Sequence, residues 1–149
     1  MSEFQPANPD FEARVRDSYS RQPFMGFLGA ELGVVEPGYC EIHLAHRAEL
    51  TQQHGYMHGG ALATLADNAA GYAAFSLMPA DASVLTVEYK LNIMRPGVGD
   101  KMTARAKVIK AGRTITVVES NVYGVDDGKE VMCVTSIQTI MALHGCEDR

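Results

Sequence analysis

The longest apolar stretch of the chain covers residues 58–78. It is rich in Ala and Leu, opens with Gly59 and Gly60 and ends before Pro79. Apolar side chains occur on every side of it, a pattern typical of a helix surrounded by other structure. Asp67 lies near its centre, where an acid costs about 2.5–3.5 kcal/mol on membrane-insertion scales. The pattern therefore predicts a helix over residues 60–77 inside a protein core, and we expect no membrane partner.

After Pro79 the pattern changes to runs of strand length that are rich in Val, Ile and Thr. These runs cover residues 83–94, 101–110, 114–123 and 130–141. Their separators are Pro96-Gly97, Ala111-Gly112 and Asp126-Asp127-Gly128, each of a composition typical of turns. We therefore expect four successive strands joined by hairpins.

Strict alternation along residues 83–94 makes a prediction about which side chains face the core. Side chains of a strand point to opposite faces in turn. The apolar set falls on one face and Thr86 on the other, so the core face is expected to carry Leu85, Val87, Tyr89, Leu91 and Ile93.

The N-terminal part of the chain predicts smaller elements. Residues 9–21 show near-helical spacing of apolar positions, which indicates a short amphipathic helix on the outside of the protein that ends at Pro23. Residues 24–36 are expected to form a turn and a strand, and residues 39–44 a second strand. One buried helix against about six antiparallel strands is an α+β architecture. We expect a single domain over residues 1–149, with residues 1–22 as an N-terminal helical extension.

Charge and cysteine content narrow the possible partners. A net charge of −5 supplies no broad basic surface, which argues against nucleic acid as a partner. The three cysteines are widely spaced and form no CxxC pair, so neither a disulfide framework nor a zinc knuckle is indicated. The N-terminus has no apolar signal core. These features together predict a cytoplasmic protein with reduced thiols.

One segment of the chain, which contains Gly59, Gly60 and Asp67, has residues suited to catalysis. The chain has no GxSxG nucleophile elbow and no glycine-rich phosphate loop, which removes the main support for a serine hydrolase or a nucleotide-dependent enzyme. Gly59 and Gly60 at a helix start leave backbone N–H groups unpaired, where an oxygen with negative charge can approach. Asp67 is the one charged side chain of the predicted helix, and an acid in apolar surroundings tends toward a raised pKa and a functional role.

A metal site is the alternative reading of the same segment. His54 and His58 are four residues apart, as metal-ligating histidines on a helix are. The glycines at 55, 59 and 60 make a helix across this pair implausible, and no third ligand is evident. We expect no metal.

The segment HGGALATLADNAAGYAA resembles the HGG-helix signature of hotdog-fold acyl-CoA thioesterases, especially the phenylacetic-acid-degradation group. The order of predicted elements and the later segment MRPGVGD are similar to that fold over nearly the whole chain. The resemblance implies a hotdog fold and hydrolysis of an acyl-CoA or acyl-carrier-protein thioester. It also implies a homodimer, paired again into a tetramer, and no cofactor, because coenzyme A is part of the substrate.

The resemblance also assigns catalytic roles by position. Asp67 corresponds to the acid that attacks the thioester or activates water, and the backbone N–H of Gly59 to the group that polarises the thioester carbonyl. Gln52 would position water or substrate, His58 is the histidine that precedes the glycines, and Thr86 falls near a residue that orients water.

Two departures from the pattern stand out. The phenylacetic type has Asn where this chain has Gln52, whereas Gln there resembles the 4-hydroxybenzoyl-CoA type, which uses Glu in place of Asp67. The choice between nucleophile and general base therefore stays open. Gly71 stands where some relatives have Thr, so substrate contacts at that position cannot be carried over.

Substrate contacts are expected from further residues. Near the motif these are Met57, Gly60 and Asn68, and the surface cations that could meet the coenzyme phosphates are Lys90, Arg95, Lys110 and Arg113. An apolar acyl pocket would be lined by Tyr56, Met57, Tyr72, Phe75 and Met78. Two other functions remain open at this point: another hotdog enzyme that hydrates or dehydrates an acyl chain, and a module that binds acyl-CoA without cleaving it.

Overall fold

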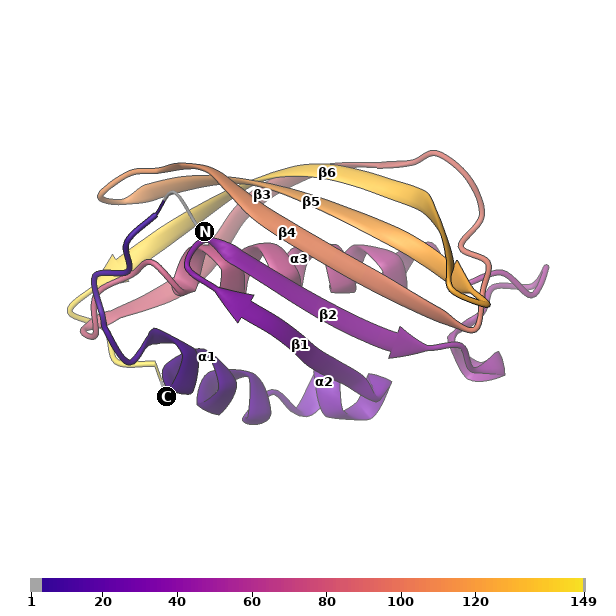
Figure 1. Ribbon diagram of the computed structural model, residues 1–149, viewed down its shortest axis with the longest axis horizontal. Helices are drawn as coiled ribbons and strands as arrows, with labels where there is room; N and C mark the ends of the chain where they lie inside the picture. Colours follow the sequence, from indigo (N-terminus) through magenta and orange to yellow (C-terminus); the bar gives the residue numbers. More distant parts are fainter. Residues whose placement is uncertain (1–3, 149) are drawn as a thin grey trace.

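A six-stranded antiparallel sheet curves around one long helix in the computed structural model, which describes residues 4–148 (Figure 1). The predicted α+β hotdog architecture is confirmed. The elements in chain order are α1 (Phe11–Ser20), α2 (Pro23–Leu28), β1 (Ala30–Glu36), β2 (Tyr39–Ala45), the 3₁₀ turn η1 (Ala48–Leu50), α3 (Gly59–Phe75), β3 (Ala82–Ile93), β4 (Lys101–Ala111), β5 (Ile115–Asp126) and β6 (Lys129–His144).

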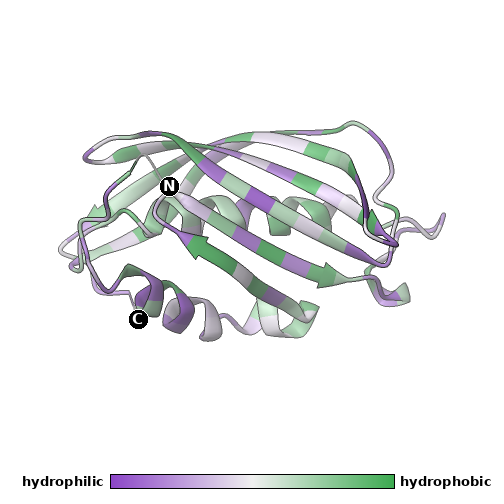
Figure 2. Ribbon diagram, viewed as in Figure 1, coloured by the Kyte–Doolittle hydropathy of each residue, from purple (hydrophilic) through white to green (hydrophobic). Residues whose placement is uncertain are grey.

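Helix α3 is the predicted central helix, and it begins and ends within two residues of the expected bounds. It contacts all six strands, and ten of its residues are buried. Figure 2 shows the largely apolar colouring of this helix. The many alanines on α3 have small side chains, which lets the sheet approach the helix closely and bury residues such as Leu62, Leu65 and Phe75. Among the described residues, no helix has the length and hydropathy that crossing a membrane requires.

The prediction of four successive strands joined by hairpins is wrong at the first connection. The strand order is β1-β2-β4-β5-β6-β3, so β3 pairs with β6 at the sheet edge and β4 pairs with β2. Residues 94–100 cross from one strand to the other and pack on β5, where a Cβ at Gly124 would overlap the carbonyl oxygen of Val98. Pro96-Gly97 is therefore part of a crossing loop, which local turn composition does not distinguish from a hairpin.

Strand β3 also departs from strict alternation. Its register against β6 shifts between Thr86 and Glu88, which is a β-bulge. Thr86 pairs with the buried Ile140 and lies on the helix side, whereas Leu85 pairs with Met141 and is half exposed. The prediction that Thr86 lies on the outer face, and Leu85 on the core face, is wrong, because the extra residue of a bulge reverses the alternation.

Two helices precede β1 rather than one: α1 lies within the predicted extension and α2 directly follows it. Pro23 begins α2 instead of leading into a turn, since proline suits the first position of a helix and lacks only an N–H that would be unpaired there. Both helices lie beside β1 (Figure 1). Helix α1 is anchored by Val15, which is fully buried, and by Arg14, which donates to the carbonyl oxygen of Pro79 at 2.7 Å.

Candidate active site

Asp67 lies midway along α3 and faces β3. The hydroxyl of Thr86 donates a hydrogen bond of 2.9 Å to its carboxylate. Burial raises the pKa of Asp67, and the Thr86 hydrogen bond offsets part of that rise, because a donated hydrogen bond favours the charged form. The bulge of β3 thus puts Thr86 on the same side of the sheet as Asp67, whereas strict alternation predicted the opposite side. A half-buried carboxylate with a fixed hydrogen-bond donor suits an acid–base or nucleophilic group.

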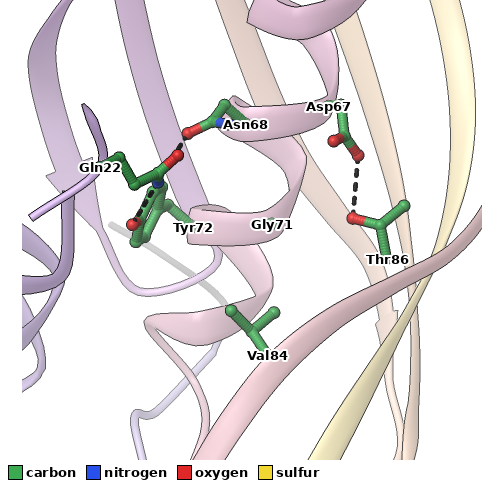
Figure 3. Close-up of a pocket in the computed structure, with 7 residues that line it drawn as sticks. All are labelled: Gln22, Asp67, Asn68, Gly71, Tyr72, Val84 and Thr86. Carbon is green, nitrogen blue, oxygen red and sulfur yellow. Dashed lines mark hydrogen bonds between the residues drawn. The ribbon is translucent and has the colours of Figure 1, made fainter. Parts of the chain in front are cut away.

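A cavity of about 110 Å³ opens beside this carboxylate. Figure 3 shows Asp67 and Thr86 on one side of it, Gln22 and Tyr72 on the other, and Gly71 of α3 between them. The complete lining is Gln22, Asp67, Asn68, Gly71, Tyr72, Val84 and Thr86. Asn68, expected to contact substrate, therefore lines the same cavity as Asp67, and its side chain points toward Gln22.

The start of α3 supplies backbone donors. His58 is the N-cap residue, and its Nδ1 accepts a hydrogen bond of 2.9 Å from the N–H of Gly60. That contact occupies the Gly60 N–H. The N–H of Gly59 takes part in none of the hydrogen bonds between residues 4–148, as expected of the first position of a helix. The N–H of Gly59 is thus available to an incoming oxygen.

Gln52 lies near this helix start, on the loop that leads into α3. Its backbone N–H donates to the carbonyl oxygen of Tyr56 at 2.9 Å, and its side-chain Oε1 accepts from the N–H of His54. A second cavity of about 360 Å³ is lined by residues around Gln52, including Gly59, Arg95, the buried Met57 and the exposed Tyr56. The loop therefore places Gln52 and Gly59 at one cavity, with the Arg95 cation beside them.

Four of the five expected catalytic residues thus fall into two groups in one chain, and the fifth, His58, is the N-cap of α3 and lines neither cavity. Asp67 and Thr86 line the smaller cavity, and Gln52 and Gly59 line the larger one. Gly59 and Asp67 are eight residues apart on α3, which is a separation of roughly 12 Å at 1.5 Å per residue. A nucleophile and an oxyanion donor must each come within about 3–3.5 Å of the reacting group. One chain alone therefore does not bring both groups to the same thioester.

Most of the other expected contacts lie away from both cavities. Lys90 is exposed on β3 and donates to Asn92 at 2.9 Å. Arg113 is exposed in the β4–β5 turn, where its carbonyl oxygen contacts His144. Phe75 and Met78 are in the core, whereas Tyr72 lines the smaller cavity.

Gln22 and Val84 line the smaller cavity and were not expected from the sequence. Gln22 comes from the junction of α1 and α2, and no sequence motif connects it with α3. Val84 sits on the helix side of β3 before the bulge, where it pairs with Ala142. Within residues 4–148 no group of three or more His, Cys, Asp or Glu side chains could hold a metal ion.

Comparison with known proteins gives a consistent picture. A family model described as the thioesterase superfamily matches residues 54–131. A crystal structure of a thioesterase family protein from Silicibacter pomeroyi is 46% identical, covers 91% of this chain and 99% of its own, and superposes with a TM-score of 0.89.

Two curated relatives have named activities. The acyl-coenzyme A thioesterase PaaI of Escherichia coli is 33% identical over 62% of this chain and 64% of its own length. The 1,4-dihydroxy-2-naphthoyl-CoA hydrolase of Listeria monocytogenes is 28% identical over 72% of this chain and 86% of its own.

Proposed function

This chain belongs to the thioesterase superfamily and is a thioester hydrolase, and we propose that it hydrolyses acyl-coenzyme A or acyl-carrier-protein thioesters with Asp67 as the catalytic carboxylate. The observation that carries the proposal is the half-buried Asp67 with the Thr86 hydroxyl bonded to it, at the wall of a cavity. PaaI and the dihydroxynaphthoyl-CoA hydrolase act on acyl-coenzyme A thioesters by name, which supports the same substrate class here.

The reaction needs two contributions from the protein. The Gly59 N–H donates to the thioester carbonyl oxygen and stabilises the negative charge that develops on it. The ionised Asp67 then either attacks the carbonyl carbon, giving an acyl-enzyme anhydride that water cleaves, or removes a proton from the attacking water. In both routes the C–S bond breaks, the thiolate leaves and the acid is released. No step requires a metal or a redox group.

The two contributions come from two chains in this proposal. Two residues of β3 mark where Asp67 and Gly59 lie along this strand. Thr86 is hydrogen-bonded to Asp67, and the tip of Ile93 is 2.9 Å from where a Cβ on Gly59 would be. If two β3 strands pair antiparallel about a two-fold axis midway between Thr86 and Ile93, each Asp67 comes next to Gly59 of the partner subunit. Such a dimer has two identical composite sites.

The β3 edge supports this pairing. It is the last strand of the sheet and is twelve residues long. Four of its apolar side chains are about half exposed in the single chain, namely Leu85, Val87, Tyr89 and Ile93. A long apolar edge strand is a template for pairing with another strand, and burying these side chains against a second copy would favour a homodimer.

The larger cavity beside Gln52 and Gly59 is suited to the coenzyme end of the substrate. Arg95 lines this cavity, and Arg95 and Lys129 both line a neighbouring cavity. Two cations can therefore bind the coenzyme phosphates. The smaller cavity beside Asp67 would then hold the acyl group. Its volume of about 110 Å³ is near that of a cavity known to hold benzene, about 150 Å³, which favours aromatic or short acyl groups.

A screen of thiol release tests the proposal. The full-length protein is incubated with aromatic, short-chain and medium-chain acyl-CoAs and with acyl-carrier proteins, and free thiol and free acid are both measured. We expect equal amounts of thiol and acid from at least one aromatic or short acyl-CoA. A thioester that is bound but stays intact, or a crotonyl-type thioester that is converted to a hydroxyacyl thioester without free thiol, would contradict it.

A further inference from the structure

A hydrogen-bonded wall closes the cavity on the side opposite Asp67. Gln22 uses both hydrogens of its Nε2 there, donating to Oδ1 of Asn68 at 3.0 Å and to the hydroxyl of Tyr72 at 2.6 Å. Ser18 adds a buried contact of 3.1 Å to the same hydroxyl. The wall therefore joins the N-terminal extension to α3 through three polar contacts. Figure 3 shows the two that Gln22 makes.

The position of this wall is fixed by packing. Tyr72 and Ser18 are buried, and Tyr72 makes an edge contact with Phe75, whose ring lies 4.0 Å from the guanidinium of Arg14. Gln22 precedes α2 without capping it through its side chain, so the Gln22 amide is not needed to start that helix. The amide thus makes its hydrogen bonds to α3, at the cavity wall, rather than to α2.

One polar atom of the wall is left open. With both hydrogens of Gln22 Nε2 in use, its carbonyl Oε1 is the remaining hydrogen-bonding atom of the amide, and it accepts none of the hydrogen bonds between residues 4–148. Gln22 lines the same cavity as Asp67. An acceptor at this place favours a ligand that brings a donor, because an apolar ligand there would shield Oε1 from water and leave it unpaired.

We propose that Gln22 is a specificity-determining residue of this enzyme, which selects acyl groups that carry a hydroxyl at the end remote from the thioester. The proposal rests on the proposed function, because it takes the cavity beside Asp67 as the acyl site. The thioester carbon lies at Asp67, the acyl group passes Gly71 on α3, and its terminal hydroxyl donates to Oε1 of Gln22. A polar group that must be paired discriminates more strongly than an apolar pocket does.

Isosteric substrates test the selection. 4-Hydroxybenzoyl-CoA and 4-methylbenzoyl-CoA differ only in an OH against a CH₃, as do 5-hydroxypentanoyl-CoA and hexanoyl-CoA. For the wild-type protein we expect kcat/KM to be at least tenfold higher for the hydroxyl member of at least one pair. Hydrolysis of both members at similar rates would overturn the role of Gln22 and leave the thioesterase function intact. Hydrolysis of none of the acyl-CoAs would instead contradict the thioesterase function.

Two variants assign the preference to the wall. Gln22→Leu removes the acceptor, so the ratio of kcat/KM for hydroxyl over methyl should fall at least tenfold, whereas a purely structural role would lower both values together. Gln5→Leu is the matched control, the same change at an exposed site of the N-terminal segment, and should keep the wild-type ratio. An unchanged ratio in Gln22→Leu would overturn the proposal.

Gly71→Val gives a second test that does not depend on Gln22→Leu folding. A Cβ at Gly71 meets nothing within 4 Å, so the added side chain enters open space next to the cavity. Valine also has a higher helix propensity than glycine, so the substitution should not destabilise α3. We expect loss of at least tenfold in kcat/KM for both aromatic substrates, with no loss in melting temperature. Undiminished hydrolysis of these substrates would show that the acyl group lies elsewhere, which overturns the proposal.

Discussion

Replacing Gly59 by proline removes the proposed oxyanion donor with little expected effect on the fold. Gly59 is the first residue of α3, where a missing N–H breaks no helical hydrogen bond and proline is favoured. The residue before a proline must be extended, and His58 already has φ −62° and ψ 135°. A Cβ at this position meets only the tip of Ile93, a flexible side chain that is 52% exposed.

The size of the effect follows from the lost hydrogen bond. Removal of one oxyanion donor costs about 10²–10³ in kcat, or about 2.7–4 kcal/mol of transition-state stabilisation. Gly59→Ala adds the same Cβ but keeps the N–H, so it separates the steric effect from the loss of the donor. We expect kcat, measured as thiol release, to fall by at least ~10²-fold in Gly59→Pro and by less than about tenfold in Gly59→Ala. Equal activities of the two variants would refute the role of this N–H.

Three further changes test the roles of the other site residues. Asp67→Asn should lower kcat by at least ~10²-fold, and its melting temperature at neutral pH should not fall, because the raised pKa of Asp67 means that its charged form is a cost to the folded state. Thr86→Val removes the hydrogen bond that lowers the pKa of Asp67, so the acid limb of the pH–kcat profile should move to higher pH; an unmoved limb would contradict this. Gln52→Ala should cost less than Asp67→Asn, since Gln52 positions groups and carries no charge, and an equal loss would reverse that division of roles.

The central helix and the fold could be predicted from the sequence because their signals are local. Apolar residues on every side of residues 58–78, with glycines before and Pro79 after, admit few structures other than a buried helix. Asp67 stands out for the same reason, as the one charge on that helix. The pairing of β3 with β6 could not be predicted, because strand-length runs and turn residues do not encode which strands become neighbours.

Two features of the site depend on tertiary structure. Thr86 reaches Asp67 because a bulge reverses the alternation of β3, and nothing in the local pattern of apolar residues marks that bulge. Gln22 reaches Asn68, 46 positions away in the chain, because α1 packs against α3 and Gln22 lies just after α1. An uncharged glutamine between a helix and a proline carries no sequence signal of a binding role.

The central claim is that each active site combines Asp67 of one chain with Gly59 and Gln52 of the other, and subunit mixing tests it most directly. An Asp67→Asn chain is mixed in equal amounts with a chain that carries Gln52→Ala and Gly59→Pro, each inactive alone, under conditions shown to exchange subunits. Half of the dimers are then mixed, and each mixed dimer has one native and one doubly damaged site, so thiol release should recover to roughly a quarter of the wild-type value by two-fold symmetry. If both chains fold, exchange is confirmed and no activity returns, the site lies within one chain and the account is wrong.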